Sequence, residues 1–202
     1  MKMKYGLLGF LVLILTGCSW VYEIGAKETD STYDISEAGM KVTNLEFTNQ
    51  DEEVTQVSDF EGDYWLANMI FTNCSTVCPL LSPNLQNLQA EAIEEELPVK
   101  VISFTVDPNQ DNPELLKQYG TNLGVDFETW TFATGYEEEE IVQFSLDSFK
   151  SRLEKAEDGS DILHTTAFFL VDPEGHVIRK YDGLETDQEE YIKDLKQAIE
   201  TK

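Results

Sequence analysis

Basic residues are scarce in this chain. It has 14 lysines and arginines against 39 aspartates and glutamates, a formal net charge of −25 at pH 7. A surface with that charge repels phosphate groups, which excludes nucleic acid and anionic lipid headgroups as partners. Such a surface is strongly solvated, and it would also attract cations and basic proteins.

The chain also lacks a hydrophobic run long enough to span a bilayer comfortably. Residues 6–15 are apolar and follow Lys2 and Lys4, but a membrane-spanning helix needs about 20 such residues. A basic start, a short apolar segment and small residues before Cys18 are typical of a signal peptide, here residues 1–17. The run Leu-Thr-Gly-Cys at 15–18 resembles a bacterial lipobox, in which the cysteine is acylated and becomes the new N-terminus.

We therefore expect a protein that is anchored to the membrane by lipid on Cys18 and lies on the extracytoplasmic face. An uncleaved N-terminal anchor is the alternative, and it leads to the same location. Without residues 1–17 the chain keeps 12 basic and 39 acidic residues, a net charge of −27.

Cysteine and histidine are scarce as well, with three and two residues. Once Cys18 is assigned to lipid, Cys74 and Cys78 remain, and an extracytoplasmic location permits a disulfide between them. A disulfide that closes so short a loop restricts the unfolded chain little and contributes little stability. The pair therefore indicates chemistry, with an inert disulfide or two buried thiols as the alternative.

The domain organisation is simple. Residues 18–38 are mostly polar and aperiodic, which predicts a flexible tether, and residues 39–202 then form one domain without internal repeats. Expected strands are 45–48, which starts a hairpin, and then 63–72, 99–106, 128–133, 164–171 and 176–181. Expected helices are 79–97, a segment from Pro113 to a stop at Gly120, 137–149 and 187–199. Pro83 makes the start of the first helix ambiguous, because Ser82 and Pro83 could be its true cap and first position.

This alternation predicts an α/β fold. After the opening hairpin, strands and helices follow each other in a way that gives a mixed central sheet with helices on both faces. In outline this is a thioredoxin-like fold.

Cys74 and Cys78 lie where a buried strand gives way to a helix. Backbone N–H groups and the dipole at a helix N-terminus stabilise a thiolate and lower the pKa of a cysteine. A spacing of four places both sulfur atoms on one side of a roughly helical turn. Two soft thiolates suit Cu(I), Zn(II) or a redox-active dithiol.

The two histidines differ in their surroundings. His176 follows a turn-like segment, 172–175, and we expect it to begin an exposed strand. His164 begins a strand after a polar loop, near the end of the sheet where the cysteine segment could meet it. A single histidine is more often structural than a metal ligand, so these residues alone leave its role open.

Three segments together resemble the SCO/SenC family of copper-binding proteins of cytochrome c oxidase assembly. They are FTNCSTVCP at 71–79, SFTVDP at 103–108 with Asp111 and Pro113, and His164 ahead of FFLVDPEG at 168–175. The resemblance runs from about residue 40 to 200. It implies that Cys74 and Cys78 are thiolate ligands and that His164 supplies an imidazole nitrogen. Cu(I) would then have three ligands, and Cu(II) would need one more. Asp107 matches an acidic position near the site, where it could support or transfer the metal or cap a turn.

The function implied by this resemblance is that of a copper metallochaperone, and not of an enzyme. It would assemble the copper-A site of cytochrome c oxidase subunit II, and we expect it to be monomeric. The alternative is a thiol–disulfide oxidoreductase that uses Cys74 and Cys78 on the cysteines of the same subunit. Three residues separate the two cysteines, and residues 163–166 contain no proline, unlike in thioredoxins, which favours metal binding. A redox or copper sensor is a third reading. A peroxidase function has less support, because no threonine-containing peroxidatic motif is evident.

Overall fold

The computed structural model describes residues 31–74, 78–156 and 161–200. The predicted signal peptide and Cys18 lie outside these residues. The strands are β1 (Glu46–Asn49), β2 (Val54–Gln56), β3 (Tyr64–Ile70), β4 (Val99–Thr105), β5 (Trp130–Thr134), β6 (Glu154–Lys155), β7 (Ile162–Leu163), β8 (Ala167–Val171) and β9 (Val177–Asp182). The helices are α2 (Cys78–Glu94), α3 (Pro113–Leu123), α4 (Glu138–Phe149) and α5 (Glu189–Glu200), with 3₁₀ turns η1 (Ser36–Ala38) and η2 (Val57–Phe60). Among the described residues, no helix is both long and apolar enough to cross a membrane.

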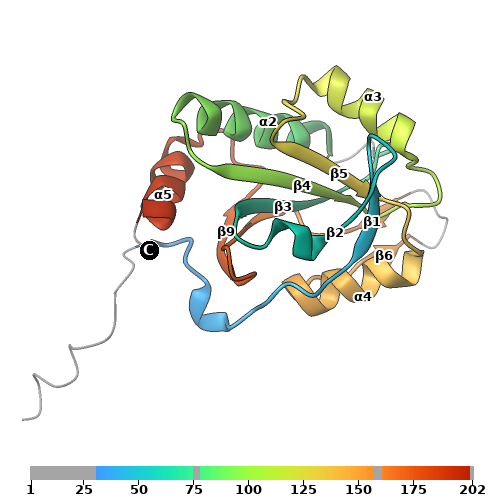
Figure 1. Ribbon diagram of the computed structural model, residues 1–202, viewed down its shortest axis with the longest axis horizontal. Helices are drawn as coiled ribbons and strands as arrows, with labels where there is room; N and C mark the ends of the chain where they lie inside the picture. Colours follow the sequence, from blue (N-terminus) through green and yellow to red (C-terminus); the bar gives the residue numbers. More distant parts are fainter. Residues whose placement is uncertain (1–30, 75–77, 157–160, 201–202) are drawn as a thin grey trace, which may run out of the picture. The chain divides into compact units, whose positions relative to one another are not determined.

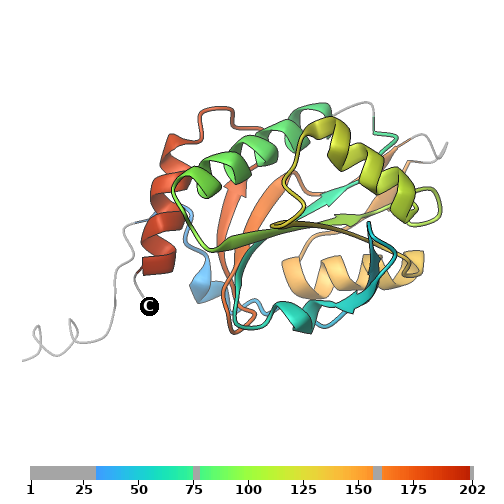
Figure 2. The ribbon, with the colours of Figure 1, turned by 45° about the horizontal axis from the view of Figure 1, so that its top comes forward.

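Seven strands form one mixed sheet in the order β2-β1-β5-β4-β3-β8-β9. The central strands β3, β4 and β5 are parallel, and the strands on either side of them join antiparallel. Helices α2 and α3 cover one face of the sheet and α4 covers the other, as Figures 1 and 2 show. The predicted α/β class and the mixed sheet with helices on both faces are confirmed.

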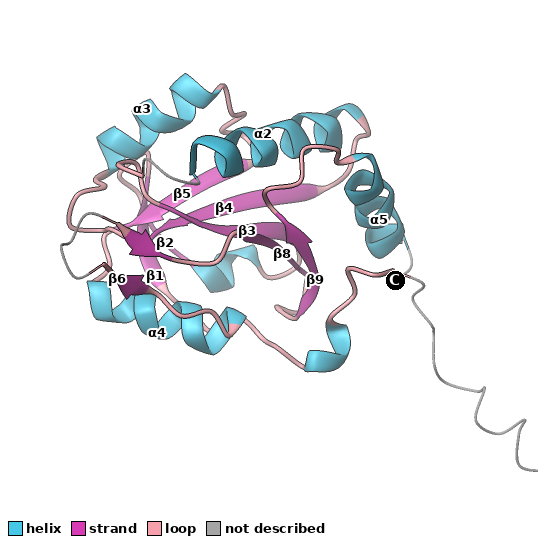
Figure 3. Ribbon diagram, turned by 180° about the vertical axis from the view of Figure 1, so that it is seen from behind, coloured by secondary structure: helices cyan, strands magenta, loops and turns pink. Residues whose placement is uncertain are grey.

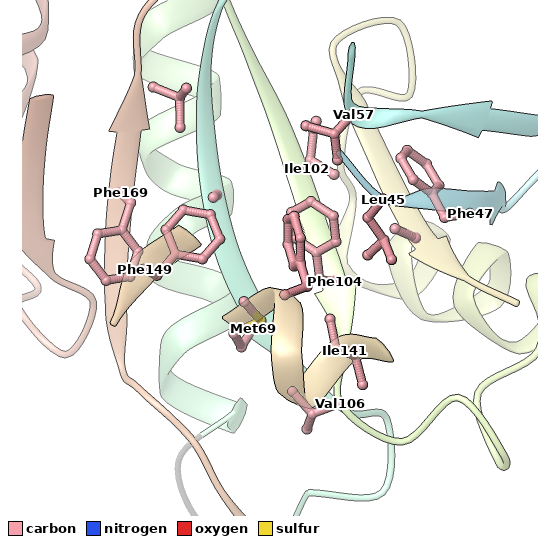
Figure 4. Packing of buried hydrophobic residues seen from close by; sticks show 14 of the residues in the cluster. Leu45, Phe47, Val57, Met69, Ile102, Phe104, Val106, Ile141, Phe149 and Phe169 are labelled. Atoms are coloured by element: carbon pink, nitrogen blue, oxygen red, sulfur yellow. The ribbon is translucent and has the colours of Figure 1, made fainter. Parts of the chain in front are cut away.

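The sheet has a hydrophobic core on each face because its central strands are buried on both sides. Along β3, Trp65 and Met69 point toward α4, whereas Leu66 and Ile70 point toward α2. Figure 4 shows the α4 side, where aromatic rings from strands and helix meet; the rings of Phe149 and Phe169 stack with centroids 4.9 Å apart. Continuous apolar strands of this kind are expected of a parallel sheet covered on both faces.

Two helix ends differ from the sequence-based expectation. Helix α3 passes through Gly120 and stops at Gly124, whose φ of +80° suits a glycine C-cap. Gly120 is there for close packing: a Cβ at this position would lie 2.7 Å from the ring of Phe132. Helix α2 begins at Cys78 and contains Pro83 in its second turn, so Ser82 is not its cap. The Ser82 hydroxyl instead accepts a hydrogen bond from Tyr119.

The folded domain begins earlier than the predicted boundary at residues 38 and 39. Tyr33 packs edge-on against Tyr191, and the Asp34 carboxylate forms a buried 2.9 Å ion pair with Arg179. The segment then runs along the outer edge of β9, where Ile35 donates a backbone hydrogen bond to Ile178. The end of the predicted tether is therefore part of the domain, because it supplies a counter-charge that a buried arginine requires. Figure 3 shows this segment beside β9 and α5.

Candidate metal centre

Cys74 lies just beyond the carboxyl end of β3. Its backbone N–H donates to the carbonyl of Phe71 at 3.3 Å, which turns the chain out of the sheet. The side chain is half-buried and packs against the core on the α4 side. The chain re-enters the described region at Cys78, the first residue of α2. The Cys78 side chain lies outside the described residues, so its role remains the sequence-based prediction.

A buried carboxylate holds the start of the cysteine segment. Asp111 is 0% exposed, and its side chain accepts hydrogen bonds from the backbone N–H of Thr72, at 3.0 Å, and from the hydroxyls of Thr72 and Thr105. Thr72 follows β3 and Thr105 ends β4, so one carboxylate joins the ends of two parallel strands. Among the described residues, no basic side chain pairs with Asp111. Three donors therefore compensate the buried charge instead.

Asp111 is the residue whose role sequence reasoning missed. The sequence marks it only as part of a family motif, and the cap of α3 is its neighbour Asn112, which accepts from the N–H of Leu115 at 2.9 Å. The usable signal was the pair of threonines at the ends of adjacent strands. Two hydroxyls at one edge of a sheet need an acceptor, and Asp107 and Asp111 are the acidic residues in the segment that follows β4.

His164 lies in the link between β7 and β8. The expected continuous strand from His164 onward is therefore interrupted, because residues 164–166 carry no strand pairing and β8 starts only at Ala167. This break lets the imidazole turn back toward the protein, where it is 8% exposed. Its Nδ1 lies 2.8 Å from the carbonyl oxygen of Thr165. A carbonyl can only accept, so Nδ1 carries the proton and Nε2 carries the lone pair.

The surroundings of His164 favour the neutral form that a metal requires. Burial lowers the pKa of the imidazole, while the Thr165 carbonyl and the charge of Asp161 act in the opposite direction. A neutral histidine is a ligand at physiological pH without first losing a proton. Coordination through Nε2 is compatible with the Thr165 hydrogen bond, whereas coordination through Nδ1 would have to break it.

Phe71 brings the two predicted ligand segments together. Its ring meets the imidazole of His164 edge to face, with centroids 5.9 Å apart. Its carbonyl also accepts the hydrogen bond from the Cys74 N–H. The residue that positions Cys74 is therefore in direct contact with His164, although the two candidate ligands are far apart in the sequence.

Asp107 lies beside this centre. Its backbone carbonyl accepts the N–H groups of Gln110 and Asp111, at 3.0 and 2.9 Å, and so begins the turn before α3. Its carboxylate caps nothing in the described region; it faces a cleft instead. Burial, and then the charge of Asp111, raise the pKa of Asp107. The side-chain capping role considered for Asp107 is thus not what the structure shows.

The cleft has a volume of about 820 Å³ and opens next to the cysteine segment. The residues 71–73, the loop after β4, helix α3 and the β6–β7 hairpin contribute to its lining. It lies at the carboxyl ends of the parallel strands, which is where open α/β sheets commonly bind their ligands.

His176 is remote from this arrangement in the fold. It lies in the turn between β8 and β9, and its side chain is 50% exposed. The buried carboxylate of Asp172 accepts the N–H groups of Glu174 and His176 and so closes the turn. Ligand atoms of these three residues lie within 4.8 Å of one another, but the turn geometry accounts for their proximity.

Comparisons with known proteins show which proteins this chain resembles. The chain matches the SCO1/SenC family model over residues 34–200. It is 39% identical over 159 residues to the SCO1 protein homolog of Bacillus subtilis, covering 78% of this chain and 82% of the relative. The crystal structure of a SCO1/SenC family lipoprotein from Bacillus anthracis superposes with a TM-score of 0.74 at 41% identity, covering 78% of this chain and 94% of that one.

Two further structures extend the comparison. BsSco is described as a member of the Sco family of cytochrome c oxidase assembly proteins with a disulfide switch. It superposes with a TM-score of 0.73 at 38% identity, covering 81% of this chain and 95% of that one. Copper-bound ScoI of Arabidopsis thaliana, at 20% identity and a TM-score of 0.65, covers 77% of this chain and 98% of that one and shares its fold. The thioredoxin-like fold is thereby confirmed, and this chain belongs to the SCO1/SenC family.

Proposed function

We propose that the chain binds one copper ion through Cys74, Cys78 and His164 and delivers it to the copper-A site of cytochrome c oxidase subunit II. The observation that carries the proposal is the double role of Phe71, which holds Cys74 by its carbonyl and contacts His164 by its ring. Two thiolates and one neutral imidazole form a donor set that suits Cu(I).

The relatives support the same function. BsSco, 38% identical to this chain, is named as a cytochrome c oxidase assembly protein, and ScoI of Arabidopsis thaliana has been crystallised with copper. Copper enters here as cargo. A three-ligand site can hold Cu(I) and still exchange it for the ligands of an acceptor.

Copper titration of the reduced protein tests the ligand assignment, and the chain provides its own control. His164→Ala should weaken Cu(II) binding more than Cu(I) binding and should change the thiolate-to-Cu(II) charge-transfer absorption. His176→Ala removes the only other histidine, in the remote turn, and should leave both unchanged. If His164→Ala behaved like His176→Ala, the imidazole would not be a ligand.

A deletion strain tests the delivery role. Loss of the gene should abolish oxidase activity of the copper-A type, and added copper should restore part of it. Normal oxidase activity in the deletion strain without added copper would overturn the chaperone proposal.

The alternative is a thiol–disulfide oxidoreductase that acts on the cysteines of the same subunit. The disulfide switch identified in BsSco favours keeping it. In that case Cys74→Ser and Cys78→Ser would abolish function equally, whereas His164→Ala would retain it. The copper proposal requires all three substitutions to impair function.

We also propose that lipid on Cys18 anchors the protein on the extracytoplasmic face of the membrane. The 41% identical Bacillus anthracis relative is a lipoprotein, which supports this anchor. Cys18→Ser should release the protein from the membrane fraction without altering its copper stoichiometry.

A further inference from the structure

Helix α3 forms one wall of the cleft beside Cys74 with a single stripe of side chains. Leu115, Gln118, Tyr119 and Asn122 all line the cleft. Their spacing of three, four and seven residues places them on one face of the helix. Within the stripe, Gln118 and Asn122 are amides, Leu115 is aliphatic, and Tyr119 packs its ring against the core on the α2 side.

Carboxamide side chains dominate the polar part of the lining. Five of them reach the cleft from three separate segments: Asn73, Asn109, Gln110, Gln118 and Asn122. Only Asn109 forms a side-chain hydrogen bond within the described region, to Glu138 at 3.2 Å. A carboxamide offers both a donor and an acceptor, which matches the N–H and C=O groups of an extended polypeptide backbone.

The charges of the cleft favour a basic group in its ligand. Asp107 and Asp161 contribute two carboxylates to the lining. Lys155 is the one basic residue among the described lining residues, and its ammonium group is engaged by Glu138 at 2.6 Å. The cleft is therefore acidic, and complementary charge in a partner would steer its approach and fix its register.

The α3 wall is held in place before any ligand arrives. The Tyr119 hydroxyl donates to Ser82 of α2 at 2.6 Å. Gly120 lies directly on the ring of Phe132 of β5, and Asn112 and Gly124 cap the two ends of the helix. A wall that is already ordered costs little conformational entropy when a partner binds.

We propose that this cleft binds an extended, basic polypeptide segment of the protein that accepts the copper. Its carboxamides would pair with the backbone of that segment, and Asp107 and Asp161 would face a lysine or arginine. This proposal rests on the proposed function, which makes the acceptor the copper-A domain of oxidase subunit II. Transfer requires the acceptor's ligands to reach Cys74. Asn73 lines the cleft and is adjacent to Cys74 in the chain, so the cleft is the nearest groove for a segment that flanks those ligands.

The test is the affinity of the reduced, metal-free chain for the copper-A domain of subunit II, measured by calorimetry. Asn122→Arg places a long cation in the cleft and should weaken binding about tenfold, the effect of losing roughly 1.4 kcal/mol at an interface. Gln118→Arg should do the same. Asn87→Arg makes the identical change at an exposed amide of α2 that does not line the cleft, and should alter binding less than twofold.

Each outcome has a defined meaning. Weakening by Asn122→Arg and Gln118→Arg alone supports the proposal. Equal weakening by Asn87→Arg would show that the affinity depends only on net charge, and this would overturn the cleft as the docking site. The absence of an effect from every variant, or of binding by the wild-type chain, would also overturn it. Copper stoichiometry is measured separately. If the wild-type chain binds the domain but no copper, the proposed function fails while the docking proposal stands.

Discussion

Two networks of buried carboxylates lie in different regions of this domain. The negative charge of the carboxylates is compensated by hydrogen-bond donors in one network and by an arginine in the other. At the candidate metal centre, Asp111 is compensated by one N–H group and two hydroxyls. On the far side of the sheet, Arg179 is 4% exposed and lies between two carboxylates, with Asp34 at 2.9 Å and Asp194 at 3.1 Å. The Tyr181 hydroxyl adds a 2.7 Å hydrogen bond to Asp194.

The difference shows what each network is suited to. An arginine between two carboxylates fixes an N-terminal segment to the sheet. Its substitution is costly, because two buried carboxylates would then lack a counter-charge. The donors around Asp111 belong to the very segments that lead to Cys74 and Asp107. The network at Asp111 therefore sets the geometry of a site, and the network at Arg179 joins the N-terminal segment and α5 to the sheet.

The largest expected effect comes from Arg179→Met. It would leave Asp34 and Asp194 buried without their shared cation and should lower the free energy of unfolding by about 3–5 kcal/mol. Urea denaturation of the variant measures this loss. Arg179→Lys keeps the charge and should lose less. A loss below about 1 kcal/mol for Arg179→Met would show that the pairing is not needed for stability.

Asp111→Ala should come next, with a loss of about 3 kcal/mol, because it leaves the Thr72 N–H and two hydroxyls without their acceptor. Unlike Arg179→Met, it should also weaken copper binding and alter the Cu(II) charge-transfer band. Asp111→Asn retains one acceptor oxygen and should recover part of both properties. If copper binding stayed intact in the alanine variant, Asp111 would be purely structural.

Truncation should give a smaller effect. A chain that starts at residue 39 lacks Tyr33 and Asp34 and should be less stable than one that starts at residue 31 by about 2 kcal/mol, through lost apolar burial and one lost ion pair. Thermal unfolding of both forms measures the difference. Equal stability would restore the predicted domain boundary after residue 38.

The smallest effects appear at alkaline pH. Burial, and then the neighbouring aspartate, raise the pKa of Tyr136 and of Tyr181 well above the usual value of 10. Both groups therefore contribute stability that is fully present below about pH 10 and is lost as pH rises toward their folded-state pKa values. Each should add about 1.4 kcal/mol per pH unit to the alkaline loss of stability. Tyr136→Phe and Tyr181→Phe should each flatten that slope, and an unchanged slope in either variant would contradict the assignment.

Much of this fold is predictable from the sequence because its signals are local. The apolar runs of β3 and β4, Pro113 at the start of α3 and the acidic first turn of α4 each mark an element within a few residues. The start of α2 is harder to predict. Proline favours the first turn of a helix, which points to a start near Pro83, but α2 begins at Cys78 and contains Pro83. The sequence predicts a helix stop at Gly120, because it does not reveal that Phe132 leaves no space for a side chain there.

The site was predictable only in part, for the same reason. Cys74 and Cys78 are marked by their spacing at a strand–helix junction. His164 could be singled out only through a family resemblance, because its contact with Phe71 joins distant parts of the chain. Asp111 and the boundary at Tyr33 depend on long-range partners, Thr72 and Arg179, that no local pattern discloses.

The segment from Tyr33 to Val42 has a consequence for how copies of this protein meet. It forms backbone hydrogen bonds with β9 at Val177, Ile178 and Lys180, so that side of the sheet offers few open hydrogen-bonding groups. The opposite edge is β2, a strand of only three residues. Short or covered edge strands give another chain little to pair with, which protects against aggregation by strand addition. A chain that starts at residue 39 would lose the hydrogen bonds to Ile178 and Lys180, and this would expose part of the longer edge, β9, to pairing with another copy.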